Sequence, residues 1–80
     1  MTNVAHTFDQ HRRRLTGIAY RMLGSRADAE DVVQDAWLRW HESAPDDLRS
    51  AEAWLVTTVT RLSLDRLRAH KAETRHYVGP

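Results

Sequence analysis

Three aspartates at positions 28, 31 and 35 are spaced so that one face of a helix would carry all three carboxylates. Like charges at this spacing repel each other and weaken an isolated helix. The positive end of the helix dipole can offset the first two, but it hardly reaches Asp35. The row therefore predicts either a solvated face or a docking surface for a basic partner. A dimetal carboxylate centre is the third reading, but the sequence lacks the pair of Glu-x-x-His motifs that such a centre needs in a helical bundle.

A second group of polar residues lies toward the C-terminus, where hydroxyl and guanidinium side chains recur at helical spacing. Such side chains are good donors to phosphates and to base edges. The alternative is an ordinary solvated helix face. The candidate nucleic-acid-binding residues are Thr57, Thr60, Arg61, Asp65, Arg68 and Lys71.

Catalytic and cofactor chemistry finds little support in the sequence. It has no cysteine, no glycine-rich phosphate loop and no serine in a strand-turn-helix elbow, and its five histidines are scattered. We therefore expect a non-enzymatic protein without a cofactor or metal. No apolar run approaches the roughly 20 residues of a membrane span. No secretory signal is visible either, so we expect a cytoplasmic protein with no membrane partner.

The net charge of +1 hides an uneven distribution along the 80 residues. Residues 1–25 carry +3, residues 26–52 carry −5 and residues 53–80 carry +3. Such a chain can present two unlike surfaces, one to a basic partner and one to a polyanion.

Apolar residues recur with a period near 3.6, and strand-like alternation is absent. This pattern predicts an all-α bundle of three helices over about 4–23, 26–41 and 51–72, with a short separate N-terminal turn, broken near residue 7, as an alternative. Gly24 ends the first helix, and Ser25 and Ser50 cap the next two. Gly17 either weakens the first helix locally or permits close packing.

The apolar stripes also predict the core. The second helix should face inward with Ala29, Val32, Val33, Ala36, Trp37 and Trp40, and the third with Leu55, Val59, Leu62, Leu64 and Leu67. We expect the third-helix residues 55, 59 and 62 to pack against Ile18 and Met22 of the first helix and against Val33 and Ala36. The tryptophans should be core or groove-lining residues.

Three segments, taken in their order along the chain, resemble a known protein family. They are Ile18–Gly24 (IAYRMLG), Asp28–Trp40 (DAEDVVQDAWLRW) and Ala53–Leu55 (AWL) leading to Asp65–Arg68 (DRLR). Together they resemble region 2 of the extracytoplasmic-function (ECF) group of sigma-70 family factors. The resemblance implies that residues 1–73 are the region 2 domain and that residues 74–80 begin an interdomain linker.

The resemblance also implies a function, namely transcription initiation. The second helix would dock on the clamp helices of the RNA polymerase β′ subunit through Asp28, Asp31, Val32, Gln34 and Asp35. The loop over 42–50 would capture a base flipped from the non-template strand of the promoter −10 element, and the third helix would help to open the duplex. An anti-sigma factor or a C-terminal regulatory domain is a further partner that the resemblance implies.

The sequence also departs from the family pattern. Family members often carry a basic residue in place of Thr57 and Arg-Asn in place of Thr60-Arg61, so the bases recognised here should differ. Asp46 and Asp47 make the loop acidic, which should weaken binding to free DNA. The alternative function is a helical adaptor that uses the acidic second helix to bind another basic protein.

Overall fold

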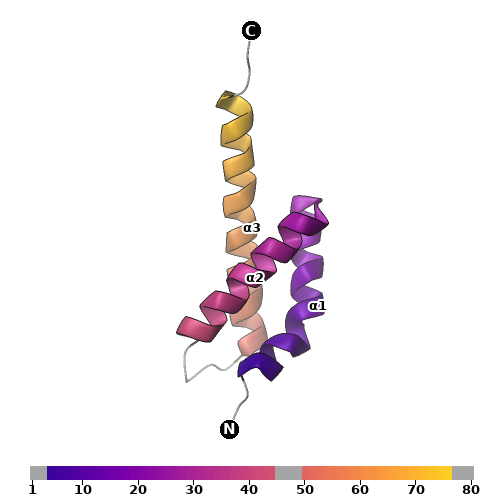
Figure 1. Ribbon diagram of the computed structural model, residues 1–80, viewed down its shortest axis with the longest axis vertical. Helices are drawn as coiled ribbons and strands as arrows, with labels where there is room; N and C mark the ends of the chain where they lie inside the picture. The colour runs from indigo at the N-terminus through magenta and orange to yellow at the C-terminus, as the bar shows by residue number, and fades with distance from the viewer. Residues whose placement is uncertain (1–3, 45–49, 77–80) are drawn as a thin grey trace.

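The computed structural model describes residues 4–44 and 50–76, which form an all-α bundle. Its helices are α1 (Val4–Leu23), α2 (Arg26–Ser43) and α3 (Ala51–His76). α1 and α3 run in the same general direction, and α2 crosses them (Figure 1). The three-helix prediction is therefore confirmed. The alternative with a short separate N-terminal turn is wrong, because α1 is continuous through residue 7.

The capping residues predicted from the sequence lie at helix ends in the structure. Gly24 has a φ of 70°, and its N–H donates to the Tyr20 carbonyl at 2.8 Å. The Ser25 hydroxyl accepts from the Asp28 N–H at 3.3 Å, and the Ser50 hydroxyl accepts from the Ala53 N–H at 3.1 Å. Each serine thus satisfies a backbone donor that the first turn of a helix leaves unpaired.

The core lies where the three helices meet. It contains Phe8, Leu15, Ala19, Ala29, Val32, Val33, Ala36, Trp40, Leu55 and Val59. Ile18 and Leu62 are partly buried and pack against it, and the edge of the Phe8 ring meets Trp37 at a centroid distance of 5.2 Å. A salt bridge from Arg14 to Glu52 adds a polar link between α1 and α3.

Two leucines of α3 are not in the core, contrary to the prediction. Leu64 and Leu67 are 39% and 38% exposed, whereas Ser63 is fully buried. Leu55, Val59 and Ser63 are four residues apart and share one face, and Leu64 is rotated about 100° from it. α3 also continues to His76, four residues past the predicted end, and its C-terminal part extends beyond α1 and α2 (Figure 1).

Candidate functional site

The three aspartates of the predicted acidic row lie along the edge of α2 that faces α3. A single guanidinium, that of Arg66 in α3, lies among them. Its Nη1 is 3.6 Å from Asp28 Oδ1 and 3.6 Å from Asp31 Oδ2, and its Nη2 is 3.9 Å from Asp35 Oδ2. We expected the helix dipole or a partner protein to offset the repulsion in this row. The structure shows a third source of positive charge near the row, namely Arg66 of the same chain.

Arg66 does not remove the row from the surface. The three carboxylates and one guanidinium keep a formal charge of −2. The Asp31 and Asp35 side chains are 66% and 52% exposed, whereas those of Asp28 and Arg66 are 29% and 31% exposed. Asp31 and Asp35 therefore remain open to a partner, and Asp28 is the member of the row closest to the interior.

The remaining residues expected to bind polymerase divide between surface and core. Gln34 is exposed beside the aspartates, but Val32 is only 1% exposed and belongs to the core. Val32 thus packs beneath the surface of the free domain, and the polymerase contact expected of it stays a prediction. Leu38, which is not among the predicted site residues, is 48% exposed one turn beyond Gln34. We call Asp31, Gln34, Asp35 and Leu38 the α2 outer face.

The candidate nucleic-acid-binding residues lie on the surface of α3. Thr57, Arg61, Asp65, Arg68 and Lys71 are exposed, and Thr60 is half-buried. Arg68 Nη1 lies 3.6 Å from Asp65 Oδ1, and both side chains are more than two-thirds exposed (75% and 69%). Such a pair is weak and can open at little cost.

Arg61 and Asp65 also line a groove between α2 and α3. This groove has a volume of about 310 Å³, and its other lining residues are Arg39, Ser43, Trp54, Thr58 and Leu62. The Trp54 ring lies 5.5 Å from the Trp40 ring, centroid to centroid, so one wall of the groove is a supported aromatic surface. The tryptophans are predicted to lie in the core or in a groove, and Trp40 and Trp54 fill these two roles. Arg39, which also lines the groove, is not among the predicted site residues.

The loop expected to capture a base, residues 42–50, lies in part outside the described residues. Residues 42–44 and 50 are described, and Ser43 among them lines the α2–α3 groove. Within the described ranges, no group of three or more His, Asp or Glu is placed to hold a metal ion. No described helix has the length and apolarity that crossing a bilayer requires.

Comparisons with known proteins show the family of this chain. The family model described as Sigma-70 region 2 matches residues 7–73. The ECF RNA polymerase sigma factor SigJ of Mycobacterium tuberculosis (strain ATCC 25618 / H37Rv) is 51% identical over 75 residues, which cover 90% of this chain and 23% of SigJ. SigL of the same strain is 40% identical over 75 residues (90% of this chain, 41% of SigL). SigW of Bacillus subtilis (strain 168) is 32% identical over 71 residues (86% and 38%).

The chain thus spans less than half the length of these relatives. No solved structure matches it significantly. The family match covers most of the chain, including all of α2 and most of α1 and α3. The chain therefore belongs to the sigma-70 region 2 family and is similar to the ECF group within it.

Proposed function

We propose that this domain is a transcription initiation module in the cytoplasm that joins RNA polymerase to promoter DNA. In this proposal the α2 outer face docks on the β′ clamp helices, and the α3 side of the α2–α3 groove contacts the non-template strand of the −10 element. The observation that carries the proposal is the exposure of Asp31, Gln34, Asp35 and Leu38 along one stripe of α2.

The α2 outer face has the chemistry that a basic helical partner would need. Its two exposed carboxylates can pair with arginine or lysine, because Arg66 leaves the row with a net charge of −2. Leu38 is four residues after Gln34 and three after Asp35, so it adds an apolar contact to the same stripe. Complementary charge around an apolar contact gives such an interface fast association and a fixed register.

Charge reversal tests the docking surface. We expect Asp31→Lys combined with Asp35→Lys to abolish pull-down of core polymerase while helix content by circular dichroism stays at the parental level. The matched control is Asp9→Lys combined with Glu73→Lys, which reverses two exposed acids on α1 and α3 and should leave the pull-down intact. Unchanged capture by the α2 variant would contradict the proposed docking surface and make the acidic row a solvated face. Absence of polymerase capture by the parental domain would favour the adaptor function.

The α2–α3 groove has the features needed to receive an unstacked base. Moving a base out of the duplex costs a few kcal/mol, and stacking on an aromatic ring returns about 1–3 kcal/mol. Trp54 provides such a ring, and Arg61 and Asp65 provide a donor and an acceptor on the same groove. We propose that Arg61 meets a base edge or stacks on a base, while Arg68 and Lys71 contact phosphates.

These two roles predict different phenotypes in a promoter-opening assay with the holoenzyme. Arg68→Ala should slow the opening of all promoters alike and reduce the dependence on salt, because phosphate contacts carry no sequence information. Arg61→Ala should change which −10 sequences are opened. Parental opening of every promoter variant by both mutants would place DNA on another face of α3.

A further inference from the structure

The guanidinium of Arg66 lies near three carboxylates at once, and it is within hydrogen-bonding distance of none of them. All three N···O distances are between 3.6 and 3.9 Å. Charge-assisted hydrogen bonds between such groups are normally about 2.7–2.9 Å long. The guanidinium is thus a shared counter-ion rather than a bidentate partner, and the exposed outer sides of Asp31 and Asp35 stay free.

We propose that Arg66 is an internal competitor for the acidic row, and that it lowers the affinity of the α2 outer face for a basic partner. This inference rests on the docking function proposed above. Cations of the partner would approach Asp31 and Asp35 from outside, while Arg66 attracts the same carboxylates from the α3 side. The partner therefore meets a surface with a charge of −2 where the aspartates alone would present −3.

The size of the effect follows from Coulomb's law. One unit charge about 6 Å from a partner cation, in a dielectric near that of water, changes the binding constant about threefold. Salt should reduce this factor, because the screening length falls from about 10 Å at 0.1 M to about 3 Å at 1 M. Competition by Arg66 is thus a modest, salt-sensitive effect on affinity.

A purely structural role for Arg66 predicts the opposite sign. If Arg66 only tied α3 to α2 and ordered the carboxylates, its loss would disorder the row and weaken docking or leave it unchanged. If Arg66 competes with the partner, its loss strengthens docking. The sign of the change in affinity therefore separates the two roles.

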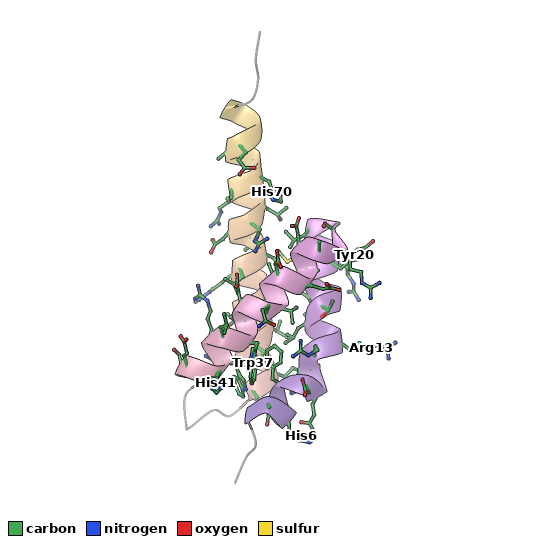
Figure 2. All side chains as sticks on the ribbon, viewed as in Figure 1. His6, Arg13, Tyr20, Trp37, His41 and His70 are labelled. Carbon is green, nitrogen blue, oxygen red and sulfur yellow. The ribbon has the colours of Figure 1, made fainter. Side chains whose placement is uncertain are left out.

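The test is a titration of the fluorescently labelled chain with core RNA polymerase at about 0.05 M and about 0.5 M salt. Arg66→Met keeps the methylene packing and removes the charge, and we expect about threefold tighter binding at low salt with most of the gain lost at high salt. Arg66→Lys keeps the charge and should bind like the parent. Arg13→Met is the matched control, because this α1 side chain extends away from the helices (Figure 2) and its loss should change affinity less than twofold. Equal or weaker binding by Arg66→Met would overturn the inference.

The same titration separates this inference from the proposed function. If Asp31→Lys with Asp35→Lys loses binding but Arg66→Met matches the parent, docking stands and competition fails. If the double reversal binds like the parent, the docking proposal itself fails.

A measurement on the unsubstituted chain covers the case in which Arg66→Met does not fold. Hexa-arginine peptide should shift the NMR signal of the Arg66 Nε–H group as it takes the carboxylates. Shifts at the Asp31 and Asp35 carboxyl carbons with an unmoved Arg66 signal would overturn the inference.

Discussion

Replacing Ser63 with alanine should make this domain more stable, although it removes a polar side chain without adding any contact. Ser63 is fully buried on the same face of α3 as Leu55 and Val59. Its Oγ has no hydrogen-bond partner among the described residues. Folding therefore takes this hydroxyl out of water without replacing the hydrogen bonds that it loses.

The expected gain follows from three terms. A buried hydroxyl without a partner costs about 1–3 kcal/mol, and alanine is about 0.5 kcal/mol better than serine inside a helix. Against this, the lost oxygen gives up dispersion contacts of about 0.1–0.2 kcal/mol each. We expect the free energy of unfolding to rise by about 1–2 kcal/mol. In a domain of this size, that raises Tm by at least about 4 °C.

Urea unfolding followed by tryptophan fluorescence, together with a thermal scan by circular dichroism, would measure this change. Ser43→Ala is the matched control, because it removes the same atom from an exposed position at the end of α2 and should stay within about 0.5 kcal/mol of the parent. A loss of stability in Ser63→Ala would contradict this prediction, since it would mean that the hydroxyl has a partner in the folded protein.

Three further predictions concern local structure and packing. Gly17→Ala should stabilise the domain by about 0.5–1 kcal/mol, because a Cβ at this helical position meets no atom within 4 Å. Gly24→Ala should destabilise the domain by about 1–2 kcal/mol, because the φ angle of Gly24 is 70°. A thermal scan of both variants checks that the two changes in stability have opposite signs. Ser50→Ala should cost about 1 kcal/mol through the lost cap, and the threonine variant should restore most of it in urea unfolding. Leu55→Ala should cost about 2–5 kcal/mol in the same assay, and a cost below 1 kcal/mol would contradict its full burial.

The helices could be predicted from the sequence because their signals are local. The Gly24-Ser25 break and the Ser50 cap act within one turn of the helix ends that they define, and the structure shows both caps in place. The end of α3 was placed too early. No glycine or proline interrupts the chain between Ala51 and His76, so nothing stops the helix at residue 72.

The details of the surfaces depend on how the helices cross, which one-dimensional patterns do not specify. Arg66 belongs to a different helix from the aspartates that it contacts, and the predicted DNA face omitted it. The sequence contains one indication of this contact, because Arg66 lies three residues after Ser63 on the inward side of α3. The apolar character of Leu67 predicts a core position, but this residue is 38% exposed.

If the α2 outer face contacts RNA polymerase, site-specific photo-crosslinking from this face should capture the polymerase. A photoreactive amino acid at Leu38 should crosslink to the β′ clamp helices, because Leu38 is exposed at the C-terminal end of the α2 outer face. The same probe at Tyr20 is the matched position, since this α1 residue is about equally exposed (51% against 48%) and lies off the stripe. Crosslinks to the clamp helices from position 38 and not from position 20 are the predicted result. Crosslinks from position 20 alone, or none to β′ from position 38, would contradict docking through the α2 outer face.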